Sequence, residues 1–321
     1  MDIRLKGTVF FEHVLPSSCS DILSTAVSAT QKRLALQDAL ECKDFDRAEE
    51  SMKEYSNDFT TILQFLKDNS ASVVLKDQPH FDWSWCGQQH MSTCWQYEKL
   101  MIHACSSDIY FKKSMRCANA KTWKDANKFI QSSGEHVATI IHQVLKQWVW
   151  KEAPSVSMTQ TEFWQSKLNL IYALKDMFTL QYGYSNPKGV TINNSMKLLN
   201  RAEHSSSISL IQWAGDYNTM LMNWCRVSRA FLSAKKWADQ GEYGKAIGLV
   251  NTFEPLLEEL HGNATLSECV DTLYNKINEV LQMKQEWEQT NNHVHYQRIE
   301  APDLETYIVD DADIKIIEPI K

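Results

Sequence analysis

Apolar residues recur at intervals of three and four positions over long stretches of this sequence, and this pattern restricts the fold most. The longest stripe comprises Tyr217, Met220, Leu221, Trp224, Val227, Phe231, Leu232 and Trp237. A helix places residues with this spacing on one face, where they can pack against neighbouring helices. The 321 residues include only 10 Gly and 7 Pro, which is few for a loop-rich or all-β protein. The sequence therefore predicts a mostly α-helical fold with about nine long helices.

Turn residues and changes of pattern give approximate bounds to these helices. The predicted ranges are 20–41, 44–67, 89–118, 121–151, 159–182 and 190–210, then the stripe at 217–237, a helix after Gly241, and a last helix that stops at Asn291 and Asn292. Residues 3–11 alternate and are rich in β-prone side chains, so they predict one or two strands. Residues 72–75 are compatible with another short strand.

Two segments resemble the turn that joins the helices of a tetratricopeptide-type hairpin. Residues 239–247 read Asp-Gln-Gly-Glu-Tyr-Gly-Lys-Ala-Ile, in which Gly241 permits a tight turn and Ala246 permits close helix packing. Residues 43–48, Lys-Asp-Phe-Asp-Arg-Ala, repeat the pattern weakly. No regular repeat separates the two segments, and no linker interrupts the chain. We therefore expect an irregular solenoid of helical hairpins.

The composition excludes several classes of protein. The net charge of −7 argues against a general nucleic-acid-binding protein, which needs a basic face. None of the eight cysteines forms a C-x-x-C pair, as expected for reduced thiols in a cytosolic protein. The charged residues 1–6 predict no signal peptide, and no apolar run approaches the ~20 residues of a membrane helix. We expect a cytoplasmic protein.

The sequence contains no pattern typical of a catalytic or metal site. It has no nucleophile elbow, phosphate-binding loop or dinucleotide fingerprint. His136 and His142 are six residues apart, which separates them by roughly 240° around a helix. His293 and His295 have no acidic residues at the spacing of metal ligands. We expect no enzyme activity, no cofactor and no metal.

Four segments together resemble a known family. They are Phe81-Asp-Trp-Ser-Trp, Trp95-Gln-Tyr-Glu-Lys-Leu-Met-Ile, Gly241-Glu-Tyr-Gly-Lys-Ala-Ile, and the terminal segment from Asn291 to Pro302. In this order they are similar to the Bro-one (BRO) domain, the boomerang-shaped helical domain of ALIX, BROX and the Bro-type protein phosphatases. The likeness is closest to BROX-like single-domain proteins and extends nearly from end to end.

The resemblance implies a single BRO domain over 1–321, built as a curved helical solenoid. It implies a small β element at 1–18, a helical body at 19–290, and an extended acidic C-terminal segment at 291–321 that packs on the body. Residues 294–302 alternate in polarity. We expect them to pack in extended form through apolar side chains such as Tyr296 and Ile299.

The resemblance also implies a non-enzymatic scaffold that acts in endosomal sorting or membrane remodelling. Family members bind the amphipathic C-terminal helix of an ESCRT-III subunit of the Snf-seven type in a concave groove. The family's groove residues correspond to Phe178, Asn194 and Leu198, with Ile192 and Met177 as further candidates. We expect this groove between the helix that ends near Tyr182 and the helix that starts at Val190. Phe178 and Leu198 are expected to be partly exposed there.

Asn194 departs from the family pattern, because it is polar where the groove is apolar. The departure leaves a second interpretation open, in which the chain is a helical-solenoid adaptor for a partner outside ESCRT-III. The sequence alone does not choose between the two partners.

A basic segment crosses residues 112–128. It contains Lys112, Lys113, Arg116, Lys121, Lys124 and Lys128. Such a segment is either a solvated helix face or a surface that contacts an acidic partner or an anionic membrane. The resemblance implies recruitment of the cytoplasmic protein to endosomal or other internal membranes. The chain ends Glu-Pro-Ile-Lys and not in the prenylation box of BROX-type chains, so we expect no lipid anchor here.

Overall fold

The computed structural model describes most of the chain and divides it into two compact units. The described residues are 3–85, 88–147, 160–186, 189–208, 215–261, 264–304 and 317–320. Unit 1 comprises Met1–Lys113, Ser132–Trp164 and Ile317–Lys321, and unit 2 comprises Ser114–Gln131 and Gln165–Ile316. The boundary between the units falls within three helices, and each unit has its own core.

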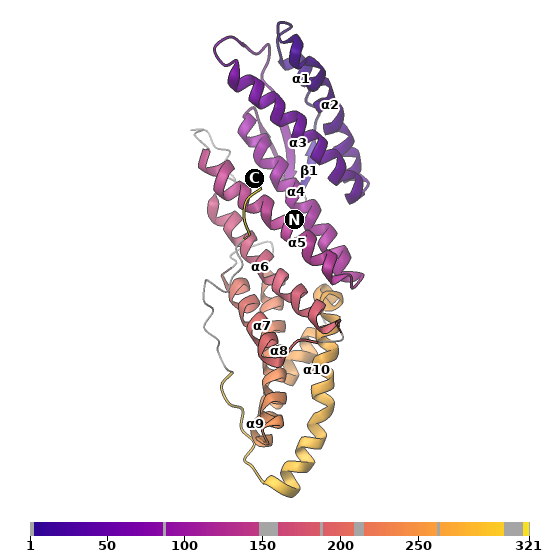
Figure 1. Cartoon of the computed structure of the whole chain (residues 1–321), viewed down its shortest axis with the longest axis vertical. Coiled ribbons are helices and arrows are strands. Elements are labelled where there is room, and N and C mark those ends of the chain that lie inside the picture. The colour runs from indigo at the N-terminus through magenta and orange to yellow at the C-terminus, as the bar shows by residue number, and fades with distance from the viewer. Residues whose placement is uncertain are drawn as a thin grey trace. The chain divides into compact units, whose positions relative to one another are not determined.

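The described residues are mostly helical, as the sequence predicted. They form α1 (Phe11–Val14), α2 (Ser20–Glu41), α3 (Phe45–Asp68), α4 (Trp95–Asn119), α5 (Trp123–Thr139), α6 (Thr161–Tyr184), α7 (Ile192–Ser207), α8 (Gly215–Asp239), α9 (Tyr243–His261) and α10 (Ala264–Thr290). Helix α2 packs along α3, and α8 packs along both α7 and α9 (Figure 1). The prediction of helical hairpins is confirmed. The predicted helix end at 148–151 and the tail residues 305–316 lie outside the described residues.

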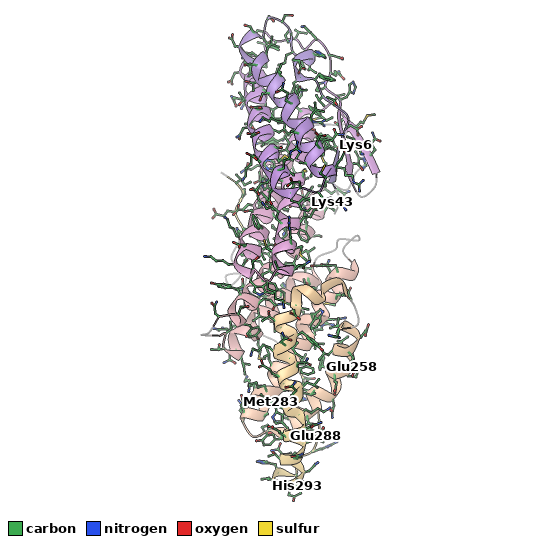
Figure 2. All side chains as sticks on the ribbon, turned by 90° about the vertical axis from the view of Figure 1, so that its right-hand side faces the viewer. Lys6, Lys43, Glu258, Met283, Glu288 and His293 are labelled. Atoms are coloured by element: carbon green, nitrogen blue, oxygen red, sulfur yellow. The ribbon has the colours of Figure 1, made fainter. Side chains whose placement is uncertain are left out.

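Three hairpins are joined by turns of the same geometry. The pairs α2–α3, α4–α5 and α8–α9 each have a left-handed residue at the centre of the turn: Lys43 (φ 56°), Lys121 (φ 59°) and Gly241 (φ 81°). In the first turn, which Lys43 marks in Figure 2, the Asp44 N–H donates to the Ala39 carbonyl at 3.0 Å, and the other two turns repeat this bond. It caps the preceding helix. The turns predicted at 43–48 and 239–247 are confirmed. The third, at 121–126, was not predicted, although Trp123 and Ala126 stand where Phe45 and Ala48 stand in the first.

A three-stranded antiparallel sheet completes unit 1. Its strands are β1 (Ile3–Lys6), β2 (Phe81–Trp85) and β3 (Gln88–Ser92), in the order β1-β2-β3. Leu5 pairs with Trp83, and Trp83 pairs in turn with His90. The helix predicted from residue 89 therefore begins only at Trp95, because β2 recruits 88–92 as a strand. The short strand considered at 72–75 is not formed, and α1 begins at Phe11, where the sequence predicted extended structure.

A buried carboxylate, Glu98 on α4, connects the elements of unit 1. Its Oε1 accepts hydrogen bonds from Arg33 Nε (3.1 Å) on α2 and from Tyr55 Oη (2.6 Å) on α3. Its Oε2 accepts from Trp83 Nε1 (2.6 Å) on β2. Arg33 also donates through Nη1 to the carbonyl of Gly7 at 2.8 Å. Glu98 and Arg33 are 0% and 2% exposed, so each charge depends on the other for compensation.

The tail that follows α10 is attached to the α8–α9 turn of unit 2. After a π-helical turn at Asn291–His295, the Asn291 and Gln297 residues exchange two hydrogen bonds of 2.9 Å. The Gln297 side chain then accepts from the Gly244 N–H and donates to the Gly241 carbonyl, both at 2.9 Å. A Cβ on Gly248 would lie 2.3 Å from the Glu300 carbonyl carbon. The backbone of 297–301 thus lies directly on α9, and we call this segment the strap.

The side chains expected to hold the strap do not do so. Tyr296 is 75% exposed and Ile299 is 50% exposed. The alternating pattern was therefore interpreted wrongly, because the strap packs through its backbone on two glycines. Further along, the Ile320 N–H donates to Thr139 Oγ1 (2.9 Å) and its carbonyl accepts from Gln143 Nε2 (3.0 Å). This second attachment belongs to unit 1.

No helix among the described residues combines the length and the apolar character that are needed to cross a membrane.

We predict that Glu98→Ala destabilises the protein by about 3–5 kcal/mol, because Arg33 keeps its charge in the core without a partner. Urea denaturation measures the loss. Glu50→Ala, which removes an exposed carboxylate from α3, is the matched control and is expected to change stability by less than about 0.5 kcal/mol. Equal losses in the free energy of unfolding for the two variants would show that the Glu98 network does not stabilise the protein more than an exposed carboxylate does.

We predict that Gly248→Ala lowers the melting temperature, although alanine in a helix interior normally stabilises by about 0.5–1 kcal/mol relative to glycine. The added Cβ would displace the strap. Removal of all residues after Asn291 is expected to lower the melting temperature too. In that shortened chain Gly248→Ala is expected to be neutral or stabilising. A stabilising effect in the full chain would contradict the strap contact.

Candidate partner-binding face

Helices α6 and α7 are held in a fixed antiparallel register within unit 2. Arg201 on α7 donates through Nε and Nη2 to the two carboxylate oxygens of Asp176 on α6, at 3.1 and 2.6 Å. At the connection, a Cβ on Gly183 would lie 2.0 Å from Val190 Cγ2, so a larger residue there would displace the Val190 side chain. The Thr191 side chain caps α7 by accepting from the Asn194 N–H at 3.3 Å. These contacts place Leu198 near the level of Thr179, and Asn194 near the level of Tyr182.

The Asp176 carboxyl is the titratable group at the centre of this contact. Burial raises its pKa above the ordinary value, and the Arg201 guanidinium opposes that shift only in part. The ion pair therefore joins two helices at a partly desolvated position. It fixes the register of α6 and α7 more than it adds to the net stability.

Two residues predicted for the groove lie in the core. Phe178 is 1% exposed and its ring packs against Trp123 of α5, with 6.1 Å between ring centroids. Met177 is 2% exposed, and its sulfur lies 3.7 Å from Cys225 Sγ. The expectation that Phe178 is partly exposed is wrong, because the segment of α5 that covers it is distant in sequence.

Two other predicted residues share the outer side of α7. Asn194 is exposed, and Leu198, one turn later, is half-buried. Lys197 is exposed beside them, and Arg201 is half-buried. We call these four residues the α7 outer face. The expectation that Leu198 is partly exposed is confirmed.

Ile192 lies on a different side of α7. Six residues separate it from Leu198, which places the two side chains about 120° apart around the helix. It lines a pocket together with Leu232 of α8 and Val280 of α10. The structure therefore divides the five predicted residues among the core, the α7 outer face and this pocket.

Sequence reasoning missed the α6 side of the face. Tyr182 is 43% exposed, and Thr179 and Lys175 are half-buried at preceding positions on the same side of α6. Asn127 donates to Thr179 Oγ1 at 2.8 Å, so α5 borders this surface. The spacing of 175, 179 and 182 is a helical spacing and could have identified the surface.

The basic segment does not form one surface. In unit 1, Lys112 pairs with Asp108 at 2.9 Å, and Lys113 pairs with both Asp46 and Glu49 at 2.5 Å. In unit 2, Lys121 pairs with Asp271 of α10. These three cations are balanced by acidic neighbours.

The remaining cations are exposed in unit 2. They are Arg116, Lys124 and Lys128. Lys124 and Lys128 each follow a residue of α5 that contacts α6, since Trp123 packs on Phe178 and Asn127 on Thr179. Two of the six predicted cations therefore lie on α5, the helix that packs against α6.

The histidines do not form a metal site in the described part of the chain. His136 Nδ1 lies 3.1 Å from His103 Nδ1, and the second candidate, His142, is exposed elsewhere. Burial, together with the charge of Lys99, lowers the pKa of His103 to about 4, so its imidazole is neutral at pH 7. No group of three or more potential ligands occurs among the described residues.

Solved structures with the same architecture align over nearly the whole chain. A structure of the Bro1 domain that addresses endosomal targeting aligns over 96% of this chain and 92% of its own, with a TM-score of 0.68 and 13% identity. The chain has the fold of the Bro1 domain. A crystal structure of ALIX with the SIVmac239 PYKEVTEDL late domain aligns over 99% of this chain and 47% of its own (TM-score 0.69, 14% identity).

A third Bro1-fold structure is a complex of the ALIX BRO1 domain with CHMP4C. It aligns over 92% of this chain and 88% of its own, with a TM-score of 0.65 and 14% identity. No protein-family model matches the chain, and no curated protein matches its sequence. The predicted resemblance is therefore confirmed for the Bro1 fold, whereas the closer likeness to BROX-type chains stays a prediction.

We predict that Phe178→Ala destabilises the protein by about 3–5 kcal/mol, as expected for a buried aromatic side chain. Leu198→Ala is expected to cost about 1 kcal/mol or less, because the side chain is only half-buried and the turn of helix is retained. Chemical denaturation of the two variants measures the difference. Similar losses would mean that Leu198 also belongs to the core.

Proposed function

We propose that this protein is a non-enzymatic scaffold whose α7 outer face binds an amphipathic helix of an ESCRT-III subunit. The observation that carries the proposal is the half-exposed Leu198 on α7 of a Bro1 fold, at a position that the family resemblance assigns to the partner groove. The complex of the ALIX BRO1 domain with CHMP4C supports a protein partner for this fold. Recruitment to endosomal membranes through this partner follows from the same proposal.

The apolar contact would be supplied by Leu198 and Tyr182. An exposed apolar side chain gains by being covered, and a partner helix presents apolar residues at intervals of three and four that can cover two such sites. We call these two residues the apolar strip; Thr179, which precedes Tyr182 by about one turn of α6, is polar and half-buried. We expect modest affinity from so small a strip.

The charges around the strip favour an acidic partner helix. Lys197 is exposed on the α7 outer face, and Lys124 and Lys128 are exposed on α5, the helix that packs against α6. Asp176, in contrast, is already paired with Arg201. Complementary charge accelerates association and sets orientation more than it adds affinity. Binding is therefore expected to weaken as the salt concentration rises.

On α7, the apolar strip ends at Asn194. Its side chain is exposed, one turn before Leu198. An apolar residue there would extend the strip by one helical turn, so Asn194 accounts for a weaker interaction than an all-apolar groove would give.

We predict that Leu198→Asp abolishes binding of an ESCRT-III C-terminal helix, because a carboxylate would have to be buried against its apolar residues. Asn194→Ile is expected to tighten binding by roughly 1 kcal/mol, or about fivefold. Fluorescence anisotropy with labelled peptides measures both effects. The matched control is Leu34→Asp, the same substitution at a leucine that is 39% exposed on α2 of unit 1, and it is expected to leave binding unchanged.

Two outcomes would contradict the proposal. If the unmodified protein binds no such helix and Asn194→Ile does not create binding, the ESCRT-III proposal is wrong. The adaptor interpretation, with a partner outside ESCRT-III, then replaces it. If Leu198→Asp unfolds the protein while Leu34→Asp does not, Leu198 is a packing residue and the face has been misassigned.

A further inference from the structure

Unit 2 contains a pocket of about 340 Å³ that is separate from the α7 outer face. It lies between the start of α7, the helix α8 and the helix α10, and Met283 on α10 marks one wall (Figure 2). A pocket of this volume falls in the range of about 300–1,000 Å³ that is typical of small-molecule sites. Of its lining residues, only Ile192 was among the five predicted from the sequence, and it was predicted for the partner groove.

The pocket lining combines apolar side chains with the polar residues Tyr184, Asn186 and Ser195. Leu232 and Val280 are the most deeply buried of its apolar side chains, at 6% and 2% exposed. Ile192 and Met283 are half-buried and form its walls. These branched and flexible side chains come from three helices and enclose a site for an aliphatic chain, which gains by leaving water.

Two lysines, Lys235 and Lys276, line the pocket together with the carboxylate of Glu279. Lys276 donates to both oxygens of Glu279 at 2.8 Å. Lys235 lies 3.5 Å from Asp239, which is long for an ion pair, and its side chain is 33% exposed. An anion at the rim can therefore form a shorter contact with Lys235 than Asp239 does.

We propose that this pocket binds a small amphipathic anion, namely an aliphatic chain of medium length that carries one carboxylate. The chain would occupy the space between Leu232, Val280 and Met283, and the carboxylate would accept from Lys235 at the rim. This inference does not depend on the proposed ESCRT-III interaction, because the pocket and the α7 outer face lie on different sides of α7.

Isothermal titration calorimetry with octanoate tests the proposal on the full chain. We expect saturable binding at one site, with octanol at least tenfold weaker because it lacks the charge. Lys235→Glu is expected to reduce octanoate affinity at least tenfold. Its matched control, Lys197→Glu, makes the same charge change on the α7 outer face and is expected to alter the affinity less than twofold.

A second variant tests where the aliphatic part of octanoate binds. Met283→Trp places a larger side chain in the pocket and is expected to abolish octanoate binding without lowering the melting temperature. Met91→Trp is its control, since Met91 is 66% exposed on β3 of unit 1. The proposal is overturned if octanoate does not bind saturably, if octanol binds equally well, or if Lys235→Glu and Met283→Trp leave the affinity unchanged.

Discussion

The carboxylate of Glu98 accepts hydrogen bonds from three elements that are remote in sequence: α2, α3 and the sheet. Its charge is buried, so it is tolerated only while Arg33, Tyr55 and Trp83 all point toward it. Arg33 in turn reaches the backbone at Gly7 and thereby fixes the connection after β1. Hydrophobic packing supplies most of the stability of unit 1, but this carboxylate selects one arrangement of its elements.

The four segments that carried the family resemblance meet in two pairs. Trp83, from Phe81–Trp85, donates to Glu98 of the segment that starts at Trp95. Gln297, from the terminal segment, bonds to the turn that contains Gly241. The sequence identified each segment as part of the resemblance but did not show that the segments contact one another. Hydrogen bonds between distant segments produce no periodic pattern in the sequence. These motifs hold the fold together, so they predict the fold well and say little about a partner.

The candidate face could be predicted only in part, for a physical reason. A helical period tells which side of α6 or α7 is apolar, but burial depends on what covers that side. Phe178 and Leu198 look alike in sequence, yet Trp123 covers the first and nothing in the described residues covers the second completely. Contacts between distant segments therefore decide which of the two side chains is buried.

The attachment of Ile320 to Thr139 joins residues 181 positions apart, within a unit whose other segments end at residue 164. During synthesis the sheet and α2–α4 can therefore assemble early, whereas this contact forms only after unit 2 has emerged from the ribosome. Contacts that span so much sequence form slowly. Until then Thr139, at the end of α5, and Gln143, just after it, lack their bonds to Ile320, so unit 1 is completed only late in synthesis.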